Sequence, residues 1–329
     1  MSKIRWGVLS TANIGRTQFI PALLRAKNSE IIAIASRGSK AHEVAKEFNI
    51  PRAYEDYNAL LHDKDVDAVY IPLPNHLHKK WVIEASKQGK HVLCEKPATL
   101  TSDEVIEMVQ ICREQNVKFM EGFMYQFHPQ HDRVKEIITS GEIGEVKLIR
   151  ASHSYYMENR DTNIRMRKEM GGGSLYDVGC YAIHAIRNIS HSEPIEVRAH
   201  SQIDLVSGID LSTHGYFDLA NGIPAFFDCS FDMVRRQEYE VIGTKGTIRV
   251  PFAFRPDFNG HVGLVIVQTT GSTREEKIHG DIFLLEVEHF SNAILNDTHP
   301  INSGNSAIYN VRALEACYES IQAGALVKV

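Results

Sequence analysis

The sequence lacks a cysteine framework and the spacing of a metal site. Its five cysteines, an odd number, are scattered along the chain without CxxC spacing. This pattern argues against a disulfide scaffold and a cysteine-rich zinc site, and it indicates reduced thiols. His76 and His78 are two residues apart, but no third histidine or carboxylate stands nearby at ligand spacing. We therefore expect no bound metal.

Long apolar runs and blocks of like charge are also missing. No segment approaches the roughly 18 consecutive apolar residues that a membrane span needs, and the N-terminus shows no signal-peptide core. The net charge is −5 without a basic block, so neither nucleic acid nor an anionic membrane is expected as a partner. With 329 residues, of which 43% are hydrophobic and 23% charged, the sequence predicts a globular, cytoplasmic protein of two domains.

Alternating strands and helices in the first third predict a doubly wound parallel sheet of the Rossmann type. Buried strand-like runs and amphipathic helical segments alternate about six times, which is the pattern of repeated βαβ units. We therefore place a dinucleotide-binding domain at residues 1–124. The expected strands are 4–9, 30–35, 68–71, 91–94 and 117–120, and the expected helices are 18–26, 41–48 and 103–115.

Two of the three fingerprint glycines are absent from the turn after the first strand. This turn keeps only the last glycine and reads Ser10, Thr11, Ala12, Asn13, Ile14 and Gly15. Small residues still let the backbone approach a pyrophosphate, and Gly15 is expected to permit close packing of the helix on the strand. All six residues are candidate cofactor contacts, although turns of small residues are also common in α/β proteins without a cofactor.

The end of the second strand lacks the acidic residue that NAD-preferring sites offer to the ribose. The strand ends instead in Ser36 and Arg37. Ser36 can hydrogen-bond a phosphate oxygen, and Arg37 can pair with the 2′-phosphate and lie over the adenine. The sequence therefore favours NADP(H), with NAD(H) as the alternative. A solvent-facing turn arginine is the other interpretation of Arg37.

Two further strand ends supply candidates at the same edge of the sheet. After strand 68–71, the candidate cofactor contacts are Pro72, Leu73, Asn75 and His78. Asn75 is equally well suited to cap a helix.

Strand 91–94 stops at Glu95, Lys96 and Pro97. Proline ends the strand, which puts Glu95 and Lys96 at the carboxyl edge where open α/β sheets bind ligands. A solvated Glu-Lys pair is the alternative.

Residues 125–329 predict an α+β domain with a large open, mostly antiparallel sheet. A strand at 146–155 is followed by a charged loop at 159–169 and a glycine run that opens a helix. Asp177, Tyr181 and His184 fall on one face of that helix, either as a site or as an ordinary polar stripe. The further expected strands are 197–203, 213–217, 224–231, 238–243, 246–250 and 263–269, followed by helices 283–295 and 307–323.

Four segments carry a family resemblance that covers nearly the whole chain. In order they read S-T-A-N-I-G, P-L-P-N-H-L-H, G-K-H-V-L-C-E-K-P and E-G-F-M-Y-Q-F-H-P. Together they resemble the Gfo/Idh/MocA family, that of glucose-fructose oxidoreductase and inositol dehydrogenase. The resemblance implies that Lys96 lies beside the nicotinamide, and that Asp177 and Tyr181 border the active site. The tyrosine resembles the dihydrodiol dehydrogenase and glucose-fructose oxidoreductase branches, and the segment R-W-G-V-L-S-T-A-N-I-G resembles members that act on aldoses, deoxy or anhydro sugars and trans-dihydrodiols.

The resulting expectation is an NAD(P)-dependent oxidoreductase that acts on a secondary alcohol or carbonyl of a sugar, polyol or trans-dihydrodiol. Hydride transfer needs an acid or base at the substrate oxygen, and Lys96 or Tyr181 can serve. We expect Tyr181 to act directly, with Lys96 orienting it or the substrate oxygen and Asp177 holding the lysine or a sugar hydroxyl. Which of Lys96 and Tyr181 moves the proton stays open.

Three more residues and two further properties complete these expectations. Tyr155, Arg165 and His184 are candidate substrate contacts. Family members often pair their sheets, which implies a homodimer or a higher homo-oligomer through the second domain. A non-catalytic dinucleotide-binding sensor on the same fold is the alternative function, although such a sensor need not keep Lys96, Asp177 and Tyr181 together.

Overall fold

The computed structural model describes residues 3–329 and divides into two compact units. The first contains the chain up to Met124 together with Phe283–Ile308, and the second contains Tyr125–Ile282 and Tyr309–Val329. The expected division at residues 124 and 125 was continuous, whereas here a late segment returns to the first unit. Residues 1 and 2, the start of the expected first domain, lie outside the described residues.

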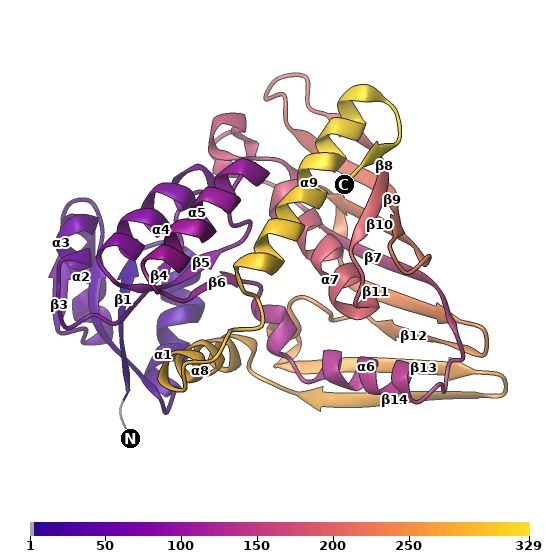
Figure 1. Ribbon diagram of the computed structural model, residues 1–329, viewed down its shortest axis with the longest axis horizontal. Coiled ribbons are helices and arrows are strands. Elements are labelled where there is room, and N and C mark those ends of the chain that lie inside the picture. The colour runs from indigo at the N-terminus through magenta and orange to yellow at the C-terminus, as the bar shows by residue number, and fades with distance from the viewer. Residues whose placement is uncertain (1–2) are drawn as a thin grey trace. The chain divides into compact units, whose positions relative to one another are not determined.

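The first unit is the predicted doubly wound parallel sheet (Figure 1). Its strands are hydrogen-bonded in the order β3-β2-β1-β4-β5-β6, so the order reverses between β1 and β4. In such sheets ligands bind at the carboxyl ends of the strands around this reversal. The strands are β1 (Ile4–Leu9), β2 (Ser29–Ala35), β3 (Arg52–Tyr54), β4 (Ala68–Ile71), β5 (His91–Glu95) and β6 (Phe119–Gly122).

The helices of this unit follow the strands closely along the chain. They are α1 (Ile20–Arg25), α2 (Lys40–Phe48), α3 (Tyr57–Leu61), α4 (His78–Lys87), α5 (Ser102–Glu114) and α8 (Ile282–Leu295). A π-helical turn, Gly15–Phe19, precedes α1, so the helix expected at 18–26 begins earlier than its apolar pattern indicated. Both β3 and α3 were missed, because three and five residues are too short to show a period.

Helix α8 belongs to the first unit because it packs on β1. The Trp6 indole, fully buried, donates a hydrogen bond to Ser291 Oγ at 3.1 Å and lies 5.8 Å from the Phe290 ring. Ser29 Oγ, at the start of β2, is 2.8 Å from the same Ser291 hydroxyl. Helical periodicity shows which face of α8 is apolar but not which sheet it covers.

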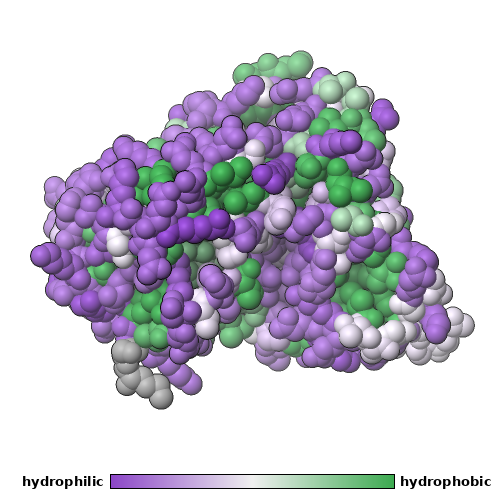
Figure 2. Space-filling view, in the orientation of Figure 1, coloured by the Kyte–Doolittle hydropathy of each residue, from purple (hydrophilic) through white to green (hydrophobic). Residues whose placement is uncertain are grey.

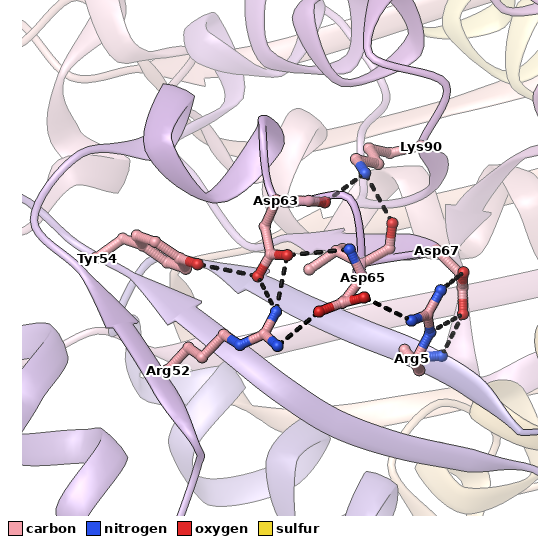
Figure 3. Close-up of polar contacts among 8 residues, drawn as sticks. Arg5, Arg52, Tyr54, Asp63, Asp65, Asp67 and Lys90 are labelled. Carbon is pink, nitrogen blue, oxygen red and sulfur yellow. Dashed lines mark hydrogen bonds and ion pairs between the residues drawn. The ribbon is translucent and has the colours of Figure 1, made fainter.

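The amino ends of the strands carry a network of charges around the loop that precedes β4 (Figure 3). Arg5 Nη2 lies 2.8 Å from Asp67 Oδ1, and buried Lys90 donates to the carbonyl oxygens of Asp63 and Val66 at 2.6 and 2.8 Å. Burial lowers the pKa of Lys90. These groups bind one another, which leaves the opposite, carboxyl edge for ligands. The labelled members are Arg5, Arg52, Tyr54, Asp63, Asp65, Asp67 and Lys90.

The second unit is built on a nine-stranded sheet, in the order β14-β13-β12-β11-β7-β10-β9-β8-β15 (Figure 1). Every neighbouring pair is antiparallel except β10 and β7, which confirms the predicted mostly antiparallel sheet. The strands are β7 (Val146–Tyr156), β8 (Pro194–Ile203), β9 (Asp210–Leu219), β10 (Pro224–Ser230), β11 (Asp232–Gly243), β12 (Gly246–Val250), β13 (Val262–Thr269), β14 (Ser272–His279) and β15 (Val327–Lys328).

One face of this sheet is covered by α6 (Gln130–Thr139), α7 (Cys180–Ser190) and α9 (Gly304–Ala323). Alternate residues of β7 show the difference between the two faces: Ile149 and Ala151 are buried, whereas Arg150 is exposed. The Ser320 hydroxyl of α9 accepts the Ala199 amide of β8 at 3.0 Å. Residues that alternate with the buried ones therefore form an outer face that α6, α7 and α9 do not cover.

The β8–β9 hairpin ends in an exposed apolar tip. Asp204 Oδ2 accepts hydrogen bonds from the Ser207 amide and hydroxyl, which fixes the turn. Leu205 and Val206 are 99% and 96% exposed within it. Figure 2 shows the hydrophobic atoms of this tip at the top of the view. In residues 3–329, no helix has both the length and the apolar composition required to cross a membrane.

Candidate functional site

The turn after β1 is held in a conformation that usually requires glycine. Ser10 has a φ of 129°, and its Oγ accepts the Ala12 amide at 3.0 Å. The helix begins at Asn13, and its first hydrogen bond runs from the Arg16 amide to the Ala12 carbonyl at 3.1 Å. The helical amides before Arg16 have no acceptor within the helix, and they follow the carboxyl end of β1. A helix start of this kind suits a phosphate group.

Gly15 itself is not required by the packing of the protein. A Cβ added there would meet nothing closer than 3.7 Å, at Pro72 Cγ, and the residue has no positive φ. The expectation that this glycine permits close helix–strand packing is therefore wrong for the protein atoms alone. Space remains at Gly15 for a ligand atom to approach the backbone.

The end of β2 brings together Thr11, Ser36 and Arg37. Thr11 Oγ1 lies 3.3 Å from Ser36 Oγ, and Arg37 is exposed. Tyr57 of α3, which the sequence did not indicate, is buried edge-on to Trp81 and interacts with both Ser10 and Arg37. Burial raises the pKa of Tyr57, so its phenol stays protonated. These polar side chains lie together, and no carboxylate is among those named.

The residues after β4 divide into exposed and buried groups. Leu73 is buried and Pro72 lies beside Gly15, while Asn75 begins a short 3-10 helix whose N-cap is Pro74. His78 is fully buried, and its imidazole bridges the carbonyl oxygens of Leu73 at 2.7 Å and Pro97 at 2.9 Å. Because both ring nitrogens contact the backbone, His78 has no polar atom left for a cofactor. It ties the loop after β4 to the loop after β5.

Glu95 is the last residue of β5 and Lys96 follows it, at the predicted edge. Glu95 Oε1 accepts a 2.5 Å hydrogen bond from Tyr70, whose ring stacks on Phe19 with centroids 3.6 Å apart. Glu286 of α8 is also buried here, and burial together with the charge of Glu95 raises its pKa well above the usual value. Lys96 therefore extends from a strand end whose neighbours are fixed by hydrogen bonding and stacking.

The second unit gathers three predicted residues into one cluster. Asp177 Oδ2 lies 2.8 Å from Arg165 Nε and accepts a 3.0 Å hydrogen bond from the Tyr155 hydroxyl. Burial, together with the charge of Asp177, raises the pKa of Tyr155, so this phenol remains a donor. Arg165 comes from the loop predicted at 159–169, which contains two short 3-10 turns. We call Asp177, Arg165 and Tyr155 the acidic cluster.

Tyr181 lies one turn after Asp177 in an aromatic pocket of the second unit. The centroid of its ring lies 5.2 Å from the ring centroid of His153, 5.6 Å from that of Phe254 and 5.9 Å from that of Tyr125. His184, one turn further, has its Nδ1 2.7 Å from the Tyr125 hydroxyl. His153 and Phe254 were not predicted, because a histidine in a strand and a phenylalanine in a loop carry no signal of a site.

The structure thus brings together Tyr155, Arg165 and Asp177, with Tyr181 and His184 on the same helix. Lys96 belongs to the first unit and Asp177 and Tyr181 to the second, so the predicted grouping of these three stays a prediction. Within the described residues, no three His, Cys, Asp or Glu side chains have the arrangement of a metal site.

Two family models match successive parts of the chain. Residues 4–123 match the GFO_IDH_MocA model, described as an oxidoreductase family with an NAD-binding Rossmann fold. Residues 131–249 match the GFO/IDH/MocA C-terminal domain. The chain belongs to the GFO_IDH_MocA oxidoreductase family. The resemblance predicted from the four segments is confirmed, and so is the nicotinamide-dependent class of enzyme.

Two curated relatives cover three quarters or more of the chain. D-xylose 1-dehydrogenase (NADP(+)) 2 of Haloferax volcanii is 37% identical over 98% of this chain and 99% of its own. Trans-1,2-dihydrobenzene-1,2-diol dehydrogenase of Xenopus tropicalis is 31% identical over 75% of each chain.

A solved structure of the family agrees in fold. The 3-ketoreductase KijD10 of Actinomadura kijaniata, in complex with NADP and TDP-benzene, has a TM-score of 0.92 and 28% identity, covering 97% of this chain and 98% of its own. All three similar proteins are named as dehydrogenases or reductases. This supports the enzymatic interpretation and not the sensor.

Proposed function

We propose that this protein is an NADP(H)-preferring oxidoreductase that interconverts a secondary alcohol and a carbonyl on a sugar, polyol or trans-dihydrodiol. The observation that carries the proposal is the acidic cluster, one helical turn from Tyr181. A fixed carboxylate with a charged and a phenolic donor suits directional hydrogen bonding to hydroxyl groups. The similarity to xylose and dihydrodiol dehydrogenases supports the same substrate class.

The residues at the carboxyl edge of the first unit fit NADP(H). The turn from Ser10 to Gly15, in which the helix begins, offers amides to the pyrophosphate, with Thr11, Ala12, Asn13 and Ile14 between them. Ser36 and Arg37 offer a hydroxyl and a positive charge to the 2′-phosphate, and no acid competes there. Pro72, Leu73, Asn75, Glu95 and Lys96 complete the proposed contacts, while His78 is reassigned to holding the two loops together.

The proposed chemistry divides between hydride and proton. NADP(H) supplies or accepts the hydride when it is bound. Tyr181 transfers the proton at the substrate oxygen, and Lys96 orients that oxygen. Asp177 is bound by both Arg165 and Tyr155, and we assign it as an acceptor for a substrate hydroxyl rather than as a base.

The cofactor and substrate are tested in one screen. The purified protein is mixed with NADPH or NADH and keto sugars, and with NADP+ or NAD+ and aldoses, inositols and trans-dihydrodiols, while the absorbance of the reduced nicotinamide is followed. We expect turnover with at least one sugar or diol and a higher kcat/KM with the phosphorylated cofactor. A clearly better kcat/KM with NADH would contradict the cofactor preference, and tight cofactor binding without turnover would contradict the enzyme.

The two proton-handling residues are tested by substitution. Lys96→Met and Tyr181→Phe are each expected to lower kcat by about 10²-fold or more and to leave the Kd of NADPH nearly unchanged. Lys87→Met on the exposed face of α4 and Tyr156→Phe on exposed Tyr156 are the matched controls, which should keep full turnover. Unchanged kcat in a site variant would remove that residue from the mechanism.

We also propose a homo-oligomeric, cytoplasmic enzyme. The outer face of the nine-stranded sheet and the apolar hairpin tip are the surfaces that support self-association. All five cysteines are free and buried, which fits a reducing compartment.

A further inference from the structure

The helix that bears Asp177 and Tyr181 starts without a cap of its own. It begins at Ser174, passes through a π-helical turn at Leu175–Gly179 and continues as α7. The residue before Ser174 is Gly173, which has no side chain that could cap the helix. The first amides of a helix have no partner within it and must be satisfied from elsewhere. A residue from a distant strand supplies the missing acceptor here.

That acceptor is Asp210, the first residue of β9, which is 2% exposed. Its Oδ2 accepts the Leu175 amide at 2.7 Å and the Ser174 hydroxyl at 2.8 Å. Its Oδ1 accepts the Tyr318 hydroxyl of α9 at 2.9 Å, and Thr213 adds a 3.2 Å bond to Oδ2. One buried carboxylate therefore joins the helix start to two other elements.

The same carboxylate is packed against the glycine run before the helix. A Cβ on Gly173 would overlap Asp210 Oδ1, and this glycine has a φ of 120°. The Gly173 amide donates to the Arg165 carbonyl at 2.9 Å, and a Cβ on Gly172 would overlap that same carbonyl. The backbone of the Arg165 loop is thus fastened to the segment that Asp210 holds.

We propose that Asp210 is a positioning residue for the reaction: by capping the Leu175 helix and fixing Gly173, it sets the geometry between Arg165 and Asp177. The inference rests on the proposed function and deepens it. Asp210 acts on both members of the pair through the backbone that it holds. A displacement of about 1 Å at a reacting group can change the rate by about 10²-fold, so the anchor need not contact the substrate to control turnover.

The test compares two ways of weakening the same cluster. Asp210→Asn replaces one carboxylate oxygen, an acceptor, by an amide group that donates. Tyr318→Phe removes only the hydroxyl that donates to Asp210, and it keeps both the helix cap and the ring contact with Tyr176. We expect both variants to lower Tm. Only Asp210→Asn should lower kcat, by about 10- to 100-fold, with the Kd of NADPH unchanged within about twofold. Equal losses of kcat in both variants would overturn the inference, because they would then follow stability alone.

A double-mutant cycle asks whether Asp210 acts through the acidic cluster. The double variant Arg165→Ala with Asp210→Asn should have a kcat little lower than that of Arg165→Ala alone, because both substitutions disturb the same pairing of Arg165 with Asp177. Additive losses would contradict the inference. If Asp210→Asn does not yield folded protein, Ser174→Ala takes its place, with an expected loss of about 3- to 10-fold in kcat; unchanged turnover there would overturn the proposal.

Hydrogen exchange separates a failure of this inference from a failure of the proposed function. If the natural protein turns over no substrate, the proposed function is contradicted. The positioning role of Asp210 can still be tested by the hydrogen exchange of backbone amides. Asp210→Asn should speed amide exchange across residues 165–177, whereas Tyr318→Phe should leave that segment near the natural rate. Unchanged exchange in Asp210→Asn would refute the anchor whatever the activity.

Discussion

Ser10 has a backbone conformation that costs a residue other than glycine about 1–3 kcal/mol. Two interactions of its hydroxyl offset that cost: the bond to the Ala12 amide, and the contact with the Tyr57 phenol. Tyr57 also interacts with Arg37. The serine therefore retains the tight turn of the fingerprint and links it to the proposed 2′-phosphate site.

Gly15→Ala separates the two reasons for a glycine at the end of this turn. The added Cβ has ordinary van der Waals space and alanine favours a helix, so Tm should stay equal or rise slightly. If the cofactor pyrophosphate approaches this backbone, the Kd of NADPH should rise by about 10-fold or more. Thermal unfolding and fluorescence titration measure the two effects. A lower Tm with an unchanged Kd would show that the glycine serves the packing of the protein and not the binding of the cofactor.

Arg37→Ala tests the origin of the cofactor preference. Without the guanidinium, the KM for NADPH should rise by about 10- to 100-fold, since a charge-assisted bond to phosphate is lost, while the KM for NADH should change little. The matched control is Arg25→Ala on α1, where the arginine donates to the Pro21 carbonyl in its own helix. Equal changes for both cofactors would show that Arg37 does not recognise the 2′-phosphate.

For single residues, the sequence predicted neighbours within one helix better than neighbours that come from different elements. Asp177 and Tyr181 were identified from their spacing on a helix, and period 3.6 is a local property. Their neighbours Arg165 and Tyr155 were chosen only as polar loop and strand residues, because contact between a loop and a helix start depends on the fold. Asp210 gave no signal, since an aspartate before a strand resembles any turn residue.

Among the elements, β14 shows why some strands escape sequence analysis. All of its eight residues, Ser272–His279, are polar except Ile278, so no apolar alternation marks this edge strand. Charge pairing holds this edge instead. Glu276 lies 2.7 Å from Arg133 of α6 and 2.8 Å from Arg274, which also pairs with Glu142. The network fastens the outermost strand to a helix of the inner face.

Glu276 gives the second unit a specific dependence on acid. Hydrogen bonds from Arg133, and then from Arg274, lower the pKa of Glu276 to about 2 from an ordinary 4.5. Because the folded-state pKa is depressed, the stabilisation is complete above about pH 4.5 and is lost as pH falls toward 2. We take it as roughly 1–2 kcal/mol after allowing for the partly exposed arginines.

Glu276→Gln should therefore lower the free energy of unfolding at pH 7. The stability of this variant should also depend less on pH in the acid range than that of the natural protein. The variant and the natural protein should converge in Tm as pH falls from about 5 to 2. Glu275→Gln, on the neighbouring exposed position of the same strand, is the matched control and should follow the natural protein at every pH. A constant difference in Tm across that range would mean that the charge of Glu276 is not the cause.

For the whole molecule, the parallel sheet was predictable and the assignment of late segments was not. Six alternations of strand and helix determine a doubly wound sheet with few alternatives. The return of Phe283–Ile308 to the first unit depends on contacts such as Trp6 with Ser291, which are 285 residues apart. No local pattern records a contact at that separation.

The outer face of the nine-stranded sheet leads to the last prediction, which concerns mass in solution. Phe226 of β10 lies on this face and is 47% exposed. The centroid of its ring is 6.1 Å from that of Tyr216, beside a hollow of about 440 Å³ that Arg150 and His214 also line.

In a twofold interface each residue occurs twice, so one added charge counts as two. Light scattering should give the natural protein a multiple of 37.1 kDa. Phe226→Glu should shift it toward a single chain, whereas Leu24→Glu on exposed Leu24 of α1 should not. A natural protein at the mass of one chain would exclude the oligomer, and equal behaviour of the two variants would exclude this face.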